Sequence, residues 1–547
     1  MKRKLNNVRI AGFLTFIIVC FGFNFGASVS AQETGRERIL EKPTPTPTQT
    51  PTANPTFSPT PIFTPTPVPI QTLTSLESKI RLTLARPELR RGTIGVKIVS
   101  LDTGKTVFES NSEKYFMPAS NMKSYTVAAA LEKLSPDFRF VTSVYAPAMA
   151  DASGVIRGDL TIYGRGDVSL STAFYDGDYY KGLDALAQKI VQAGVKRIEG
   201  NLVGDESYFT GNAIPQGWEW DDLQWYYGAE ISALPINDNA VDLSVKPGSV
   251  NSPCAVQILP ANTILKIVNR CTTSVSGTKR DVQVFKKLDQ NIIEVSGTIS
   301  SGDKGFQGSV AVARPAQLFV ELLRGLLIQK GVVITGQNKL LNAKDKPIFA
   351  VASPVPQVEI AKLESPPLSI IAAKTMKPSQ NTYTETILRA LGEQVGDKTD
   401  AKKSSEERGL GAVQSFLLQA GISADSVIQY DGSGLSRHDL ITPGSAVQLY
   451  TYMSKSRFAN VWRDALTIGG VDGTLQNRFK GTLAAGNVRG KTGTIDQVSS
   501  LSGYINSAAG EKLVFSIIVN GVNNVRLRQA TIDEIVLSLA NFNGKTN

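Results

Sequence analysis

A proline-rich segment separates the start of this chain from everything in it that can fold. Between residues 43 and 69 the 547-residue chain carries ten of its 27 prolines, most of them alternating with threonine. Proline fixes φ and removes a backbone donor, so such a run forms neither helix nor sheet and behaves as an extended, semi-rigid spacer. We therefore expect residues 32–74 to be a linker that provides reach, and the folded part to begin near residue 75.

Residues 1–31 have the pattern of a secretory signal peptide. The basic run Lys2-Arg3-Lys4 precedes an apolar stretch from about Ile10 to Phe25, and the small residues Val29 and Ala31 fit a cleavage site. The alternative is an uncleaved membrane anchor, because the apolar stretch is nearly long enough to span a bilayer. In both cases the chain is expected to be exported, to a periplasmic or extracytoplasmic place. After cleavage we expect no stable membrane anchor.

Charge and the scarcity of two residue types exclude several classes of protein. The net charge is +10, and losing four basic residues with the leader leaves +6 spread along the chain, which is too dilute to predict nucleic-acid binding. His438 is the only histidine, and one of the three cysteines, Cys20, lies in the leader. Sites that need two histidines, cysteine-rich zinc modules and iron–sulfur clusters are therefore excluded. We expect no metal and no cofactor.

Two cysteines remain in the exported part. Cys254 and Cys271 lie 17 positions apart in a region of short, strand-like runs. Exported chains fold in an oxidising setting, where such cysteines usually pair. We predict a disulfide between them; two buried free thiols are the alternative.

The two ends of the folded region are predicted to form one α/β layer structure. Thr93–Ser100 and Lys105–Phe108 are apolar-rich runs around a turn, which is a hairpin signal. Ser120–Leu134 has Ala, Leu and Val at helical spacing and stops before Pro136. The C-terminal end adds a predicted strand, Leu513–Val519, and a predicted amphipathic helix, Ala530–Ala540.

The middle of the chain has a different character and is predicted to be an insertion. Helices are expected at Tyr179–Gly194 and Pro315–Gly331, and a strand at Arg197–Val203. Short strands with Gly, Ser and Asn turns fill the residues between these parts. The expected domains are a catalytic domain at 75–145 and 350–547, an inserted α/β domain at 146–240 and 313–349, and a small β-rich domain at 241–312.

Three polar motifs carry the candidate chemistry. The Ser-x-x-Lys spacing occurs three times, but only Ser120–Lys123 opens a strong helix, where residues i and i+3 share a face. Lys491-Thr492-Gly493 lies in a predicted strand, and a phosphate-loop interpretation fails because Ala485 stands where that motif needs glycine. Ser379-Gln380-Asn381 precedes a helix predicted from about Thr384 to Leu391.

In this order the motifs are those of penicillin-binding proteins and class A β-lactamases. The chain resembles that superfamily over about residues 75–145 and 350–547. Ser120 and Ser379 are 259 positions apart. An insertion of this size is similar to the D-alanyl-D-alanine carboxypeptidase/endopeptidase family of class C penicillin-binding proteins, type 4-like (peptidase family S13). The runs 217–223 and 431–438 are similar to further stretches of that family. The resemblance implies an α/β (α+β) chain with the serine β-lactamase/penicillin-binding-protein-like transpeptidase fold and a large inserted accessory region.

Elementary chemistry assigns roles to the first motif. A serine hydroxyl is a poor nucleophile until a base removes its proton, and a single histidine makes a histidine base improbable. A lysine can serve if its pKa falls, which a second cation and a dry pocket both favour. We therefore expect Ser120 to be the nucleophile and Lys123 the general base, with Lys491 as the second cation.

The other motif residues are expected to bind and to move protons. Ser379 would relay the proton to the departing amine, and Asn381 would hold Lys123 and the substrate amide. Lys491-Thr492-Gly493 and Thr494 would bind the terminal carboxylate of the substrate. The resemblance implies that the backbone N–H groups of Ser120 and Thr494 form the oxyanion hole.

The resemblance also suggests that Asp222, Tyr227 and Arg437 line a subsite for the charged end of a diamino acid. A zwitterionic terminus needs one anion and one cation, which Asp222 and Arg437 would supply. A structural salt bridge or turn contacts are the alternative.

The function that these expectations describe is an exported serine-type D-Ala-D-Ala carboxypeptidase, with endopeptidase action on cross-links left open. It would act on peptidoglycan stem peptides through an acyl-enzyme, and β-lactams would acylate Ser120. The alternatives are a β-lactamase or esterase on the same fold, and a non-catalytic peptidoglycan-binding protein. The sequence says nothing of the oligomeric state.

Overall fold

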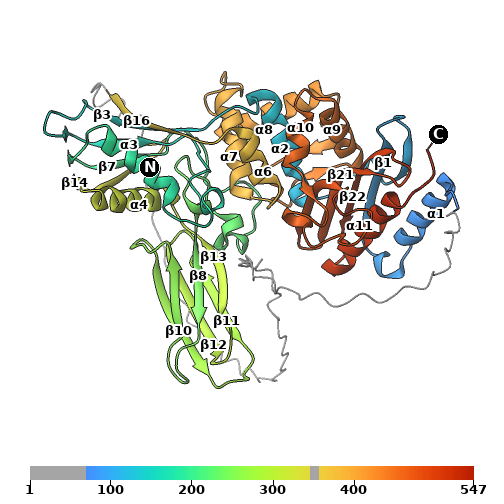
Figure 1. Ribbon diagram of the computed structural model, residues 1–547, viewed down its shortest axis with the longest axis horizontal. Coiled ribbons are helices and arrows are strands. Elements are labelled where there is room, and N and C mark those ends of the chain that lie inside the picture. Colours follow the sequence, from blue (N-terminus) through green and yellow to red (C-terminus); the bar gives the residue numbers. More distant parts are fainter. Residues whose placement is uncertain (1–68, 345–356, 547) are drawn as a thin grey trace, which may run out of the picture. The chain divides into compact units, whose positions relative to one another are not determined.

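The computed structural model describes residues 69–344 and 357–546, and all that follows refers to these residues (Figure 1). The expected signal peptide and nearly all of the expected linker lie outside the described residues. Within the described ranges, no helix combines the length and the apolar character that a bilayer crossing requires.

A six-stranded antiparallel sheet joins the two ends of the folded region. Its order is β19-β20-β21-β22-β1-β2. The strands are β1 (Thr93–Ser100), β2 (Thr106–Ser110), β19 (Thr467–Ile468), β20 (Arg489–Ile495), β21 (Val498–Asn506) and β22 (Lys512–Asn520). β22 pairs with β1 over eight residues, from Thr93 opposite Asn520 to Ser100 opposite Leu513. The expectation that both chain ends share one layer structure agrees with this pairing.

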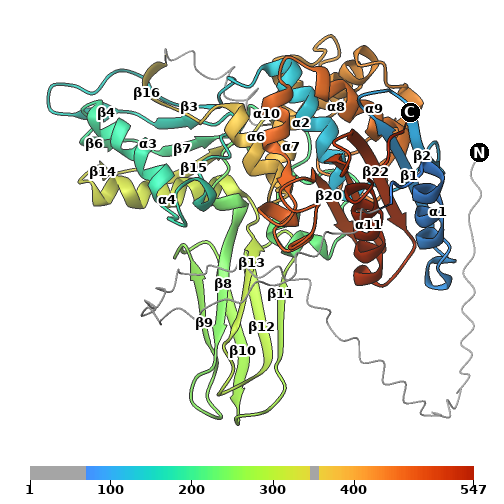
Figure 2. The same cartoon turned by 45° about the vertical axis from the view of Figure 1, so that its right-hand side comes forward.

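The strand β22 shows how the sheet separates two hydrophobic cores. Its residues point alternately to opposite faces, as the two-residue period of a strand requires. Phe515 and Ile517 lie in one core, which α1 (Leu73–Leu84) and α11 (Val525–Ala540) cover (Figure 2). Val514 and Ile518 lie in the other core, against a layer of six helices. These are α2 (Lys123–Leu134), α6 (Leu368–Met376), α7 (Asn381–Gln394), α8 (Ser405–Gln419), α9 (Pro443–Lys455) and α10 (Ala459–Ala465).

The helix α2 is buried along most of its length. Its residues from Lys123 to Leu131 are all buried, which agrees with the alanine-rich sequence. The helix begins three residues later than predicted, because Ala119–Met122 forms a 3-10 turn, η2. Ala119, the first residue of this turn, has φ +48°, in the left-handed region. Ser120 therefore lies on a tight turn that leads into α2.

The inserted region contains two sheets and two helices around a third core. One sheet has the order β15-β7-β5-β3-β16 and the other the order β14-β6-β4. The strands are β3 (Val141–Ala146), β4 (Val155–Arg157), β5 (Leu160–Tyr163), β6 (Arg197–Glu199), β7 (Leu202–Asp205), β14 (Val333–Ile334), β15 (Asn338–Leu341) and β16 (Val358–Glu364). The helices are α3 (Lys181–Gln192) and α4 (Pro315–Gln329).

Strand pairing places the ends of the insertion away from the expected boundaries at residues 145 and 350. β3 and β16, which those boundaries put largely in the catalytic domain, pair with each other, and β3 also pairs with β5. The two chain passages meet at Phe140 and Ser365, where each backbone N–H donates to the other residue at 2.9 Å. We therefore propose that the insertion runs from about residue 140 to residue 365.

Two three-stranded sheets make up the part expected to be a small β-rich domain. Their orders are β13-β8-β9 and β10-β12-β11. The strands are β8 (Ala240–Lys246), β9 (Ala255–Leu259), β10 (Lys266–Ser274), β11 (Asp281–Lys286), β12 (Ile292–Ser300) and β13 (Phe306–Ala311). One further pair, β17 (Val427–Ile428) with β18 (Leu440–Ile441), lies outside the insertion. That residues 241–312 fold as a domain of their own stays a prediction.

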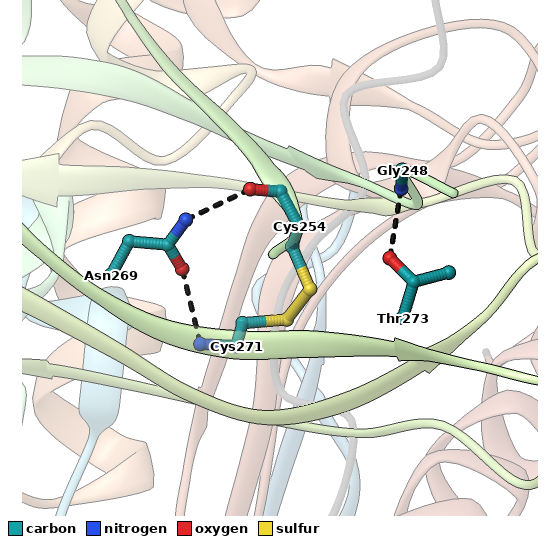
Figure 3. The surroundings of a disulfide bond; sticks show 5 residues. All are labelled: Gly248, Cys254, Asn269, Cys271 and Thr273. Atoms are coloured by element: carbon teal, nitrogen blue, oxygen red, sulfur yellow. Dashed lines mark hydrogen bonds between the residues drawn. A yellow bond between two sulfur atoms is a disulfide. The ribbon is translucent and has the colours of Figure 1, made fainter. Parts of the chain in front are cut away.

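A disulfide connects Cys254, next to β9, with Cys271 of β10 (Figure 3). Asn269 lies beside it and bonds both cysteines: its Nδ2 donates to the Cys254 carbonyl at 2.8 Å and its Oδ1 accepts from the Cys271 N–H at 3.1 Å. Both cysteines are buried. The bond thus ties together the two small sheets.

Removal of this disulfide should loosen the β-rich sheets and leave the catalytic residues unchanged. Because the bond closes a short loop, replacing both cysteines by alanine is expected to lower the free energy of unfolding by about 3 kcal/mol. Denaturant unfolding measures that change, and the acylation rate of the variant by a penicillin should equal that of the parent. Titration of two free thiols in the denatured, unreduced protein would show that the bond does not form.

Candidate active site

The candidate site lies at the end of the sheet where β20 is nearly an edge strand. Among the described residues, β19 pairs with β20 only at Arg489 and Gly490. In the described part of the chain, no strand pairs with that edge of β20 from Lys491 onward. An unpaired strand edge offers backbone donors and acceptors to an extended peptide.

Ser120 and Lys123 meet as the spacing predicted. The Nζ of Lys123 donates to the Ser120 Oγ at 2.9 Å. The same Nζ donates to the Asn381 Oδ1 at 2.5 Å and to the Ser433 carbonyl at 2.8 Å. Lys123 has no exposed surface, whereas Ser120 is half-buried. The amine is therefore held by three oxygens, one of which is the hydroxyl that could react.

Lys491 makes the matching contact with Ser379. Its Nζ donates to the Ser379 Oγ at 2.9 Å and to the Thr492 carbonyl at 2.8 Å, and Lys491 too is fully buried. Ser379 has φ +68°, a conformation that is costly for a residue other than glycine. Since Asn381 is two residues from Ser379, one loop serves both lysines.

The turn carrying Ser120 is fixed against β20 by close backbone approach. The Nδ2 of Asn121 donates to the Lys491 carbonyl at 3.0 Å and to the Ser500 Oγ at 2.6 Å. A Cβ on Gly493 would lie 2.4 Å from the Pro118 carbonyl oxygen. Only glycine lets strand and turn come this close, which gives Gly493 a structural role.

The remaining residues of the Lys-Thr-Gly strand point in different directions. The Thr492 hydroxyl shares a hydrogen bond of 2.6 Å with the hydroxyl of Thr474. Thr494 is exposed, and its hydroxyl donates to the Gly493 carbonyl at 2.8 Å. The structure therefore brings Ser120, Lys123, Ser379, Asn381 and Lys491 together, with Thr492, Gly493 and Thr494 on the adjoining strand.

A buried carboxylate that the sequence analysis missed fixes the Ser433 carbonyl beside Lys123. Asp431 accepts from the backbone N–H groups of Ser433 at 3.0 Å, Gly434 at 2.5 Å and Ser436 at 2.8 Å. It also accepts from the Trp218 indole N–H at 2.8 Å. The run 431–438 and Trp218 were noted in the sequence, but a carboxylate that caps a loop has no pattern distinct from an ordinary Asp-Gly turn.

Two further acids lie beside Asp431, and their pKa values are raised. Burial, together with the neighbouring Asp431, raises the pKa of Asp439 well above its ordinary value. Burial, then Asp431 and Glu406, raises the pKa of Glu385 to about 8. The Glu385 Oε2 accepts from the Gly432 N–H at 3.0 Å.

Glu385 should make the protein less stable as the pH rises. From its ordinary pKa up to about 8, the folded chain keeps the Glu385 proton and the unfolded chain has lost it, so the free energy of unfolding falls across this window. Glu385→Gln keeps the acceptor for Gly432 and should reduce the fall, which unfolding at pH 5 and at pH 8 would measure. Glu359→Gln, at an exposed position of β16, is the control and should leave the fall unchanged. Equal pH dependence in the Glu385→Gln variant and the parent would contradict the assignment.

Asp222, Tyr227 and Arg437 each have partners close to the motif residues, and Arg437 takes part in a salt bridge of the kind given as the alternative to a subsite. Arg437 pairs with Glu219, Nε to Oε2 at 2.8 Å, and its Nη1 donates to the Asp496 carbonyl at 3.2 Å. Asp222 instead bonds the Tyr227 hydroxyl, and its pKa is raised to about 6, first by burial and then by Asp221 and Glu219. The sequence offered three acids there and no means of choosing.

Tyr227 reaches the motif residues through its backbone. Its carbonyl accepts from the Asn381 Nδ2 at 2.8 Å. Burial and the neighbouring Asp222 raise the pKa of its hydroxyl. Within the described ranges, no three His, Cys, Asp or Glu side chains are arranged to hold a metal ion.

The fold and this site define a serine enzyme of the penicillin-binding and β-lactamase type. The model of the D-Ala-D-Ala carboxypeptidase 3 (S13) family matches residues 76–542, and the chain belongs to this family. The expected family and fold class are thereby confirmed.

Known proteins resemble the chain over most of its length. A D-alanyl-D-alanine carboxypeptidase of Actinomadura sp. (strain R39) is 31% identical over 484 residues, which are 86% of each chain. The D-alanyl-D-alanine carboxypeptidase DacB of Haemophilus influenzae is 27% identical over 80% of this chain and 87% of its own. The crystal structure of penicillin binding protein 4 (dacB) from the same organism matches with a TM-score of 0.71 at 24% identity, covering 87% of this chain and 100% of that one.

Proposed function

We propose that the chain is a serine-type D-Ala-D-Ala carboxypeptidase in which Ser120 is the nucleophile and Lys123 its general base. One observation carries this proposal: the Lys123 Nζ lies 2.9 Å from the Ser120 Oγ on a fully buried side chain. A proton can pass directly over that distance. The relatives' names supply the substrate, a peptide that ends in D-Ala-D-Ala.

The reaction starts with Lys123 in its neutral form. The Ser120 oxygen attacks the carbonyl carbon of the scissile bond while the Ser120 proton moves to Lys123. The N–H groups of Ser120 and Thr494 stabilise the oxyanion that forms. When the C–N bond breaks, Ser379 gives a proton to the departing amine of D-alanine and regains the one that Lys123 took from Ser120, so Lys123 is neutral again and Lys491 keeps its charge. The acyl group stays on Ser120 until water attacks it and restores the hydroxyl.

Substrate binding follows from the charges at the strand edge. The substrate lies along β20, and its terminal carboxylate binds Lys491, Thr492 and Thr494. Hydrolysis of a peptide cross-link is the same bond cleavage with a longer leaving group, so it belongs to the same proposal. β-Lactams enter as mimics of the acyl-D-Ala-D-Ala end; the Haemophilus influenzae protein was solved complexed with a novel β-lactam.

The place of action is outside the cytoplasm, after export by the leader at residues 1–31. The disulfide between Cys254 and Cys271 supports this, because such bonds persist in oxidising compartments. Peptidoglycan stem peptides are the natural substrates there.

Release of D-alanine from a peptide ending in D-Ala-D-Ala tests the nucleophile. Ser120→Ala should lower the rate by about 10⁴-fold or more, since a nucleophile and its base act as a unit. The matched control is Ser276→Ala, which alters the exposed Ser276–Lys279 copy of the motif and should leave the rate unchanged. Full activity in the Ser120→Ala variant would refute the assignment.

Asp222, Tyr227 and Arg437 are proposed to form the subsite for the diamino acid of the stem peptide. Arg437 binds the carboxylate of its charged end, and Asp222 binds the ammonium. When the substrate binds, the salt bridge between Arg437 and Glu219 would then break, or Arg437 would contact both Glu219 and the substrate carboxylate.

Arg437→Ala should lower kcat/KM about tenfold for a peptide with a free diamino acid terminus, which one lost charged contact accounts for. It should leave kcat/KM nearly unchanged for the analogue in which a neutral side chain replaces that terminus. An equal loss on both peptides would show that Arg437 acts only through the structure.

A further inference from the structure

The loop that carries Ser379 and Asn381 is also bonded to the inserted region. Gln380 lies between the two motif residues in the sequence, and its Nε2 donates to the Asp238 Oδ2 at 2.9 Å. Gln380 is only 8% exposed. The residue that the motif leaves unspecified is therefore the one that anchors the loop.

Asp238 also forms a hydrogen bond with a residue in the first turn of α7. Its Oδ1 accepts from the Tyr383 hydroxyl at 2.6 Å and from the Ser171 hydroxyl at 2.6 Å. Tyr383 is three residues beyond Gln380, so one carboxylate bonds residues i and i+3 of the same chain segment. Both oxygens of Asp238 are thus used, by two donors from this segment and one from Ser171.

Asp238 lies in the middle of three consecutive residues with left-handed backbone conformation. Asn237, Asp238 and Asn239 have φ values of +47°, +59° and +57°. Each such residue costs about 1 kcal/mol or more and persists only where the surroundings enforce it. Apart from glycine, asparagine and aspartate are the residues that adopt this left-handed conformation most readily.

The side chains of the two flanking asparagines hold this backbone conformation in place through hydrogen bonds. The Asn237 Nδ2 donates to the Tyr179 carbonyl at 3.0 Å, and the Asn239 Nδ2 donates to the Glu230 carbonyl at 2.7 Å. The position of Asp238 is therefore set within the insertion, independently of Gln380.

We propose that Asp238 is a positioning residue, through which the inserted region sets the geometry of the Ser379–Asn381 loop and so the rate at which Ser120 is acylated. The loop needs such support because Ser379 itself is left-handed. The Tyr227 carbonyl, which accepts from Asn381, adds a second contact from the insertion. This inference rests on the proposed function, because it assumes that Ser379 and Asn381 act on Ser120 and its substrate.

A double-mutant cycle between positions 238 and 380 tests the proposal. Gln380→Glu places a carboxylate against Asp238, which repels it and displaces the loop. A misplacement of this kind is expected to slow acylation by a fluorescent penicillin about 10²-fold at about pH 8. Asp238→Asn keeps the backbone preference, and its amide can turn so that the Tyr383 and Ser171 hydroxyls accept from it; we expect a change of less than about threefold.

The double variant, which combines Asp238→Asn with Gln380→Glu, is the decisive member of the cycle. In it the amide introduced at position 238 can donate to the carboxylate introduced at position 380, so the acylation rate should return to within about threefold of the parent. Gln394→Glu, at the exposed far end of α7, makes the same chemical change away from the loop and should have no effect. If Gln380→Glu does not fold, Gln380→Met removes the donor without adding charge and should still slow acylation.

The outcomes separate this inference from the proposed function. A parent protein that is not acylated on Ser120 refutes the function. A parent that is acylated, with a Gln380→Glu variant that is slow but not rescued by Asp238→Asn, overturns the positioning role. So does a Gln380→Glu or Gln380→Met variant that is as fast as the parent.

Discussion

Two lysines without exposed surface, Lys123 and Lys491, dictate most of what surrounds the site. Burying an amine is costly unless oxygens replace the water that it loses. Three separate loops deliver most of those oxygens: the turn of Ser120, the loop of Ser379 and Asn381, and the run that begins at Asp431. The Thr492 carbonyl on β20 supplies one more, to Lys491. The same hydrogen bonds that make burial tolerable place each serine hydroxyl on an amine, so stability and chemistry share one set of contacts.

These loops are far apart in the sequence, and the fold brings them together in two ways. The pairing of β1 with β22 closes the sheet, and α2 and β20 then meet across the Asn121 bond to the Lys491 carbonyl. The insertion supplies the rest. Its residues Asp238 and Tyr227 bond Gln380 and Asn381, respectively. It is therefore part of the support of the site as well as an appendage of the chain.

The sequence predicted what depends on local pattern. Ser120 and Lys123 could be paired because one turn of helix separates them, and Lys491-Thr492-Gly493 could be placed in a strand from the run 488–495 that contains it. The disulfide partners were few enough to assign. The Ser-x-x-Lys copy at Ser276 could be set aside because no helix follows it.

What the sequence could not show depends on contacts between distant residues. Asp238 lies in an Asn-Asp-Asn run that is typical of any turn, and its partner Gln380 is 142 positions away. The residues next to Asp431 and Glu385 in the sequence do not indicate that these two carboxyl groups are buried. Glu219, Asp221 and Asp222 are adjacent in sequence, and only the structure shows that Arg437 selects the first. The start of α2 was predicted three residues too early because Ala119–Met122 forms a 3-10 turn, which the spacing of apolar residues does not distinguish from the first turn of an α-helix.

The most direct test of the central claim is the mass of the protein after treatment with a penicillin, followed by tryptic mapping. Cleavage after Lys114 and Lys123 yields the peptide Tyr115–Lys123, in which Ser120 is the only serine. The account predicts one added penicillin, carried on this peptide. An unmodified protein, or an adduct on any other peptide, would contradict it.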